Sequence, residues 1–121
     1  NWSKVKTFSN IRNWIAVLNI YCHNVQSLKN KLSEIDVSLQ CELKNAHILC
    51  ISEHWFQDTV IELVKLQNFN LISYFSRTCH MHGGVSIFVR DCLKASSLDV
   101  SKFTNEMHIE LAAVHLPSLD L

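Results

Sequence analysis

The residues best suited to metal-assisted chemistry follow two short apolar runs of the chain. Asn24 comes soon after residues 14–21, and Glu53 comes directly after residues 46–52. A carboxylate is a suitable ligand for Mg²⁺, which prefers oxygen ligands and keeps several of its waters. An amide can hold a phosphate oxygen or orient a water nucleophile. The alternative is that Asn24 makes a turn and that Glu53 is a solvated residue opening a loop.

A second group of residues offers zinc ligands. Cys79, His80 and His82 lie within four residues, and Cys50 and His54 are four apart. Thiolate and imidazole are the ligands that Zn²⁺ prefers. No second pair has zinc-like spacing, however, and the polarity of a surface loop explains the first group more simply. A zinc module is therefore the lesser alternative.

The elements that would position Asn24 and Glu53 form a strand, a helix and a strand. Residues 14–21 and 46–52 are short, apolar and rich in β-formers, which predicts buried strands. Between them an apolar stripe recurs at three- and four-residue steps from Leu28 to Leu43, which predicts a helix with Ser27 as its N-cap. This βαβ order predicts parallel strands and a right-handed crossover. Ligand sites in open α/β sheets gather at the carboxyl ends of such strands, so Asn24 and Glu53 should meet there.

The remaining segments are less regular. We expect residues 1–13 to be a polar extension and residues 22–24 to be a polar break. Asp58 is a candidate cap for a short helix that reaches residue 64. Further strands are predicted in three segments that are separated by a polar, glycine-containing turn and a less regular stretch: residues 68–75, 85–89 and 108–116.

Composition favours one globular domain without a basic nucleic-acid footprint. Hydrophobic residues make up 48% of the 121 residues and charged residues 18%, and only two glycines and one proline interrupt the chain. Eleven basic residues balance eleven acidic ones, so the net charge offers no steering toward DNA. Five cysteines without a Cys-x-x-Cys pair argue against a disulfide scaffold. With no signal-like or membrane-length apolar run, we expect an intracellular protein, nuclear or cytoplasmic, that is neither secreted nor membrane-bound.

Three blocks of the chain carry a resemblance to a known superfamily. They are LNIYCHNVQSLKNKLSEID, HILCISEHWF and HGGVSIFVR, in that order. In order and spacing they resemble the N-terminal half of the endonuclease/exonuclease/phosphatase superfamily, and most of all the apurinic-type endonuclease domains of non-LTR retrotransposons. The resemblance runs from about residue 16 to residue 90, with a faint continuation in IELAAVHL.

The resemblance implies a role for several residues. Asn24 matches the catalytic Asn that contacts the scissile phosphate or orients the attacking water. Glu53 matches the Glu that binds Mg²⁺ or Mn²⁺, with DNA as the implied partner. Arg77 and the Gly83–Gly84 turn match a segment near the nucleic-acid face. His23 departs from the commoner Gln before the Asn, and the glycine run is shorter than usual.

The resemblance also implies a fold and a shortfall. A complete domain is an α+β sandwich of four layers, α/β/β/α, about twice this length, so residues 14–121 should be an α/β half of it that starts with the βαβ unit. The later Tyr, Asp-x-Asn, Asp and Asp-His motifs have no match in this sequence. We therefore expect the isolated chain to be inactive or nearly so. Its open sheet surface could promote self-association, and a non-catalytic remnant or interaction module of a transposable-element protein is the alternative.

Overall fold

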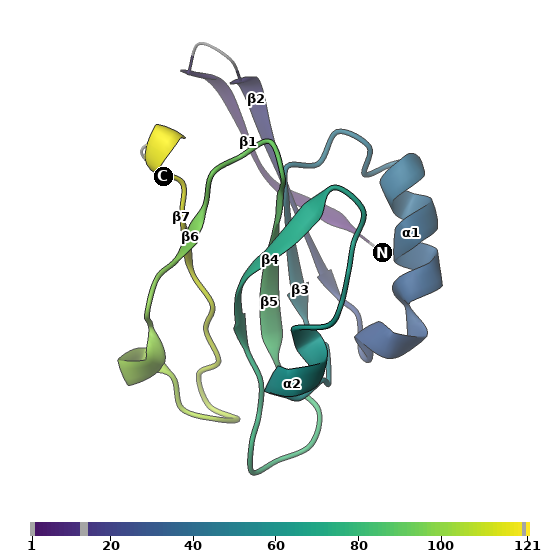
Figure 1. The fold of residues 1–121 in the computed structure, drawn as a ribbon, viewed down its shortest axis with the longest axis vertical. Coiled ribbons are helices and arrows are strands. Elements are labelled where there is room, and N and C mark those ends of the chain that lie inside the picture. The colour runs from purple at the N-terminus through teal and green to yellow at the C-terminus, as the bar shows by residue number, and fades with distance from the viewer. Residues whose placement is uncertain (1, 13–14, 120) are drawn as a thin grey trace.

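The computed structural model describes residues 2–12, 15–119 and 121. One five-stranded mixed sheet, in the order β1-β2-β3-β5-β4, forms the centre of the molecule, and β6 and β7 form a small second sheet (Figure 1). The strands of the larger sheet are β1 (Ser3–Arg12), β2 (Ile15–Asn24), β3 (Ile48–Ser52), β4 (Phe69–Phe75) and β5 (Val85–Arg90). Those of the smaller sheet are β6 (Ser96–Ser97) and β7 (Val114–His115).

The helices are short. Among the described residues, the α-helices are α1 (Leu32–Gln40) and α2 (Asp58–Ile61). The same residues form the 3₁₀ turns η1 (Leu28–Asn30), η2 (Ser101–Phe103) and η3 (Pro117–Leu119). In the part of the chain that the structure describes, no helix has the length and apolar character needed to cross a membrane.

The predicted strand–helix–strand unit is confirmed, with longer pairing than expected. β2 and β3 are parallel, from Ile20 beside Ile48 to Asn24 beside Ser52. Residues 22–24 are therefore not a break: although polar, they complete the ladder with β3, because backbone hydrogen bonding does not depend on side-chain polarity. Trp14, the predicted start of this strand, lies outside the described residues.

The predicted helix over residues 28–43 is divided. Ser27 does not cap it: its φ is 88° and its side chain makes no capping hydrogen bond, and α1 begins only at Leu32. The chain leaves the helix after Gln40, and the N–H of Leu43 donates to Ser38 O at 2.9 Å. Leu28 and Leu43 are both fully buried all the same. The apolar stripe was thus a correct sign of core residues, and its ends are formed by a 3₁₀ turn and a terminal loop.

The predicted polar extension over residues 1–13 is a strand in its described part, and residues 1 and 13 lie outside the described residues. Ser3–Arg12 is the edge strand β1, paired antiparallel with β2, with register shifts between Lys4 and Lys6 and between Ser9 and Arg12. Its polar composition suits an edge position, where one side of the strand faces solvent. The strand was not predicted because residues 3–12 lack the apolar run that marks a buried strand. Its hydrogen-bonding partner, β2, follows it in the chain.

The later elements match in part. β4 and β5 lie close to the predicted bounds, joined by the glycine-containing turn. Asp58 is the first residue of α2 and Gln57 its N-cap, so Asp58 does not cap the helix, which also ends at Ile61. The predicted strand over residues 108–116 shrinks to Val114–His115. The backbone groups of Ile109 bond back to those of Asn105, so the start of the predicted strand folds onto its own segment instead of joining a ladder.

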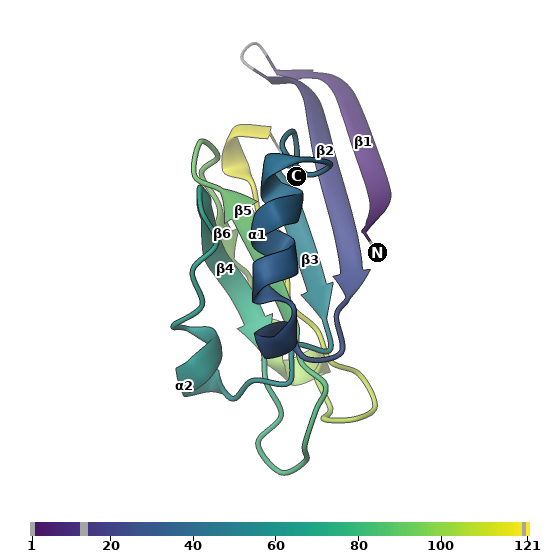
Figure 2. The same cartoon turned by 90° about the vertical axis from the view of Figure 1, so that its right-hand side faces the viewer.

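The chain combines helices with a mixed sheet, which is an α+β arrangement. Two apolar clusters lie on opposite faces of the main sheet. α1 covers one face, and the segment that carries β6 and β7 lies on the other (Figures 1 and 2). The cluster on the α1 face includes Ile35, Leu49 and Phe88. The cluster on the other face comprises Leu18, Ile48, Val89, Leu93, Leu116 and Leu119. β3 contributes to both clusters, because successive side chains of a strand point to opposite faces of the sheet.

Candidate functional site at the carboxyl edge of β2 and β3

The structure places Asn24 and Glu53 at the same edge of the sheet. Asn24 is the last residue of β2 and pairs with Ser52, the last residue of β3, so Glu53 follows directly beside it. The Asn24 side chain is exposed and that of Glu53 is half-buried. The parallel pairing predicted from the sequence therefore brings the amide and the carboxylate to one edge.

The backbone of Glu53 is fixed in an uncommon conformation. Its φ is 59°, in the left-handed region that non-glycine residues rarely adopt. Its N–H donates to Gly84 O at 2.8 Å, and its carbonyl accepts from Ser27 N at 2.9 Å. Hydrogen bonds on both sides hold the strained residue, a feature that is frequent at functional sites and that also occurs in tight loops.

One carboxylate oxygen of Glu53 is occupied and the other is open. Trp55 Nε1–H donates to Oε1 at 3.2 Å. Among the described residues, no hydrogen bond reaches Oε2. Trp55 is itself held by its N–H, which donates to Gly83 O at 2.9 Å, and by stacking on His82 with ring centroids 3.9 Å apart. The carboxylate is thus oriented by an indole while keeping an oxygen free for a ligand.

His54, next to Glu53 in sequence, has no ring nitrogen left for catalysis. It is fully buried; its Nδ1 accepts from Phe56 N–H at 2.9 Å, so Nε2 carries the proton that is donated to Phe75 O at 2.9 Å. Burial lowers the pKa of His54 below its ordinary value, against the raising effects of the Phe75 hydrogen bond and nearby carboxylates. The imidazole is therefore a neutral structural group.

Arg77, the predicted nucleic-acid contact, is engaged by a carboxylate. Its Nε donates to Glu110 Oε2 at 2.6 Å and its Nη1 to Met81 O at 2.9 Å. Glu110 also accepts from Gly84 N–H at 3.0 Å and Met107 N–H at 2.8 Å. Burial would raise the pKa of Glu110, but these hydrogen bonds and the Arg77 charge lower it overall. The positive charge of Arg77 is largely neutralised within the fold.

The alternative zinc ligands do not meet. His80 Nδ1 is paired with Glu106, which also accepts from the N–H groups of Thr78 at 2.7 Å and Cys79 at 3.0 Å. His82 stacks on a tryptophan instead. Within residues 2–12, 15–119 and 121, no three His, Cys, Asp or Glu side chains are arranged to hold a metal ion.

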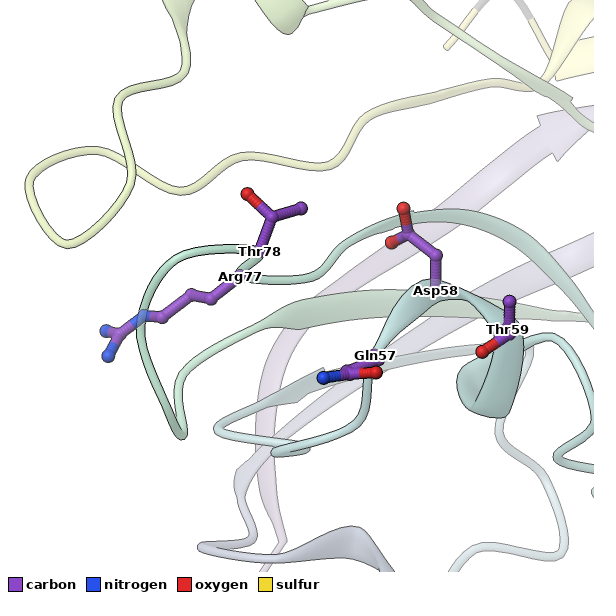
Figure 3. Close-up of a pocket in the computed structure, with 5 residues that line it drawn as sticks. All are labelled: Gln57, Asp58, Thr59, Arg77 and Thr78. Atoms are coloured by element: carbon purple, nitrogen blue, oxygen red, sulfur yellow. The ribbon is translucent and has the colours of Figure 1, made fainter.

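Two of the cavities near this edge are lined mainly by residues that follow β3 and β4. The larger, of about 410 Å³, is lined by Trp55, His82 and Lys29 among others. The smaller, of about 240 Å³, is lined by Gln57, Asp58, Thr59, Arg77 and Thr78 (Figure 3). In Figure 3 the Arg77 side chain extends away from Asp58 and Thr59, so these polar groups do not converge on one point.

Sequence reasoning missed His54, Glu106 and Glu110. His54 was considered only as a zinc ligand together with Cys50, four residues earlier, although its place between Glu53 and Trp55 put it at the edge. Glu106 and Glu110 act on loop residues 26 to 33 positions earlier. No local pattern marks such long-range contacts.

Comparison of the chain with protein-family models, with curated proteins and with solved structures found no match. A proposal for function therefore depends on the residues at this edge and on the sequence blocks around them.

Proposed function

We propose that this chain contributes part of the active site of a metal-dependent phosphodiesterase, acting as an endonuclease on DNA. The observation that carries the proposal is that Asn24 and Glu53 lie at the same carboxyl edge of two parallel strands. The resemblance of the blocks around them to retrotransposon endonucleases supports the same reading. In this proposal Glu53 is a metal ligand and Asn24 holds a phosphate oxygen or orients water.

The edge offers a divalent ion one carboxylate ligand, that of Glu53. Glu53 has one oxygen without a hydrogen-bond partner among the described residues, and Mg²⁺ is commonly held by one or two carboxylates with several waters retained. When bound, the ion would supply Lewis-acid stabilisation of the charge that develops on the phosphate. A single carboxylate predicts weak binding, and Trp55 keeps that carboxylate in one orientation.

General acid–base chemistry is what the edge lacks. His54 uses both ring nitrogens in hydrogen bonds and is neutral, and Glu110 is committed to Arg77 and two backbone N–H groups. Positioned acid–base groups typically contribute about 10²- to 10⁴-fold to the rate. We therefore expect the isolated chain to bind metal weakly and to nick DNA very slowly or not at all.

Paramagnetic broadening by Mn²⁺ tests the metal site directly. In amide spectra, we expect broadening centred on Asn24 and Glu53, and Glu53→Gln should remove it while preserving the side-chain length and the Trp55 hydrogen bond. Glu34→Ala is the matched control, because Glu34 is an exposed carboxylate on α1. Plasmid nicking is measured in parallel with Mg²⁺ or Mn²⁺.

Each outcome has a defined meaning. Broadening elsewhere, or broadening unchanged in Glu53→Gln, would contradict the metal role of Glu53. Nicking that is lost in Glu53→Gln would support the proposed reaction and overturn the expectation of inactivity. Broadening without nicking supports a metal-binding edge that lacks its acid–base partners.

A further inference from the structure

The larger cavity beside the edge has the size and lining of a small-ligand site. Its volume of about 410 Å³ falls within the range of roughly 300 to 1,000 Å³ that is typical of ligand pockets. Trp55, Phe56 and Met81 give it aromatic and apolar walls, and Ser27 and Gln57 add polar groups. None of the residues lining it is acidic. Such a lining suits a planar ring that carries a negative group.

Trp55 and His82 form a preorganised aromatic platform in this cavity. Their rings are stacked at 3.9 Å with an angle of 22° between planes. Trp55 is fixed further by hydrogen bonds from its backbone to Gly83 and from its indole to Glu53. Trp55 nevertheless keeps 37% of its surface exposed. An aromatic group that is both rigid and exposed can stack a base at a small entropy cost.

The charge around the cavity points to one cation. Arg77 is paired with Glu110 and His80 with Glu106. Lys29 also lines the cavity, and among the described residues no carboxylate pairs with it. In this wall the ammonium group of Lys29 is thus the cation that remains available to bind an anion.

We propose that this cavity binds an unpaired nucleotide, with the base stacked against Trp55 and His82 and the phosphate held by Lys29. The inference rests in part on the proposed function, since it places a nucleotide beside Glu53. It goes further by naming the substrate class as nucleic acid with an unpaired base rather than a small phosphoester or intact duplex. Both the base and the phosphate should contribute to binding, because the Trp55–His82 platform and Lys29 are separate parts of the cavity wall.

Calorimetric titration in the presence of EDTA tests this binding without any metal. We expect adenosine 5′-monophosphate to bind better than adenosine, which lacks the phosphate, or ribose 5-phosphate, which lacks the base. A short single-stranded oligonucleotide should bind at least as well as the free nucleotide. The same strand in a duplex should bind less well, because its bases are already stacked.

Variants identify the cavity as the place of binding. Trp55→Leu should weaken binding of the nucleotide about 5- to 150-fold, and Trp55→Phe should retain most of it. His82→Asn removes the second ring and suits the positive φ of 66° at that position. Lys29→Gln should weaken binding about fivefold. The matched controls are Phe103→Leu and Lys65→Gln, which change exposed residues that do not line the cavity.

Failure of this inference and failure of the proposed function are distinguishable. Nucleotide binding that survives in EDTA and in Glu53→Gln, with no metal binding at the edge, would support the cavity and contradict the metal site. Metal binding and nicking without nucleotide binding up to about 1 mM would overturn the cavity and leave the proposed function standing. Equal loss of binding in Trp55→Leu and Phe103→Leu would also overturn it.

Discussion

At the scale of single residues, the turn glycines are required by their neighbours as well as by the turn. Gly84 has φ of 89°, and a Cβ there would lie 2.4 Å from Cε1 and Nε2 of His54. His54 cannot move aside easily, because it is fully buried and both nitrogens are hydrogen-bonded. Gly83 has φ of 66°, and its Cβ would meet the end of the flexible Arg77 side chain. The resemblance suggested a place for this turn near nucleic acid, and the contacts add a packing role.

Gly84→Ala should therefore destabilise the protein more than Gly83→Ala. The added methyl group forces a left-handed backbone and overpacks His54, which together should lower the free energy of unfolding by about 2 to 4 kcal/mol. Gly83→Ala incurs the backbone strain, but Arg77 can swing away at the expense of its Glu110 contact, so its loss should be smaller. Urea unfolding of both variants measures the difference. Equal losses of unfolding free energy in the two variants would show that backbone strain, and not the contact with His54, determines the destabilisation.

At the scale of elements, the loop between β4 and β5 is held by a carboxylate from the C-terminal segment. Glu106 accepts from the N–H groups of Thr78 and Cys79 and is paired with His80. The Thr78 hydrogen bond, first among several, lowers the pKa of Glu106 from 4.5 to about 2. The stabilising contribution of the carboxylate is thus fully present above about pH 4.5 and is lost as the pH falls through about 2.

Glu106→Gln should loosen this loop without unfolding the sheet. The amide side chain keeps an acceptor oxygen but loses the charge, so its hydrogen bonds to the Thr78 and Cys79 N–H groups become weaker. We expect faster amide hydrogen exchange at these two positions and unchanged exchange in β3. Asp99→Asn is the matched control, since Asp99 is an exposed carboxylate that accepts from Ser101 N–H elsewhere. Exchange at Thr78 that is unaffected by Glu106→Gln would show that the loop is held by other contacts.

The same contacts explain which elements the sequence could predict. The unit of β2, α1 and β3 was predictable because its apolar spacing is local, and this unit also places Asn24 and Glu53 together. The segment after residue 104 was not predictable, because it is shaped by groups far away in sequence. Ala113 N–H, for example, donates to Ser73 Oγ at 3.1 Å, forty residues earlier. The split of the helix at Lys31 likewise follows backbone contacts that residues 27 and 28 make with residues 53 and 54.

At the scale of the whole molecule, apolar residues of the described part pack on both faces of the main sheet, beside α1 on one face and beside residues after β5 on the other. The sequence led us to expect an apolar sheet face without a partner. Leu93, Leu116 and Leu119 instead pack against Leu18, Ile48 and Val89 on that face. A larger second sheet on this face, as in a four-layer sandwich, would have to extend or displace the small sheet of β6 and β7 and stays a proposal.

The balance of charge over the molecule limits how nucleic acid can bind. Eleven basic and eleven acidic residues leave no net charge, and two side chains that line the cavity, Arg77 and His80, are already paired with carboxylates. Contacts with phosphates release counterions, so the logarithm of the binding constant falls linearly with the logarithm of the salt concentration. For single strands the slope is about −0.7 for each phosphate contacted. If Lys29 makes the main phosphate contact, the slope of log K against log salt for a single-stranded oligonucleotide should be near −0.7.

Fluorescence anisotropy at about 50 to 200 mM salt measures this slope. Lys29→Gln should bring it close to zero, whereas Lys65→Gln should leave it unchanged, because Lys65 is an exposed lysine that does not line the cavity. A slope of about −3 or steeper would mean that several other cations contact the strand, in which case binding uses a surface other than the cavity wall. A shallow slope that persists in Lys29→Gln would assign the phosphate contact to another residue while leaving the stacking role of Trp55 open to its own test.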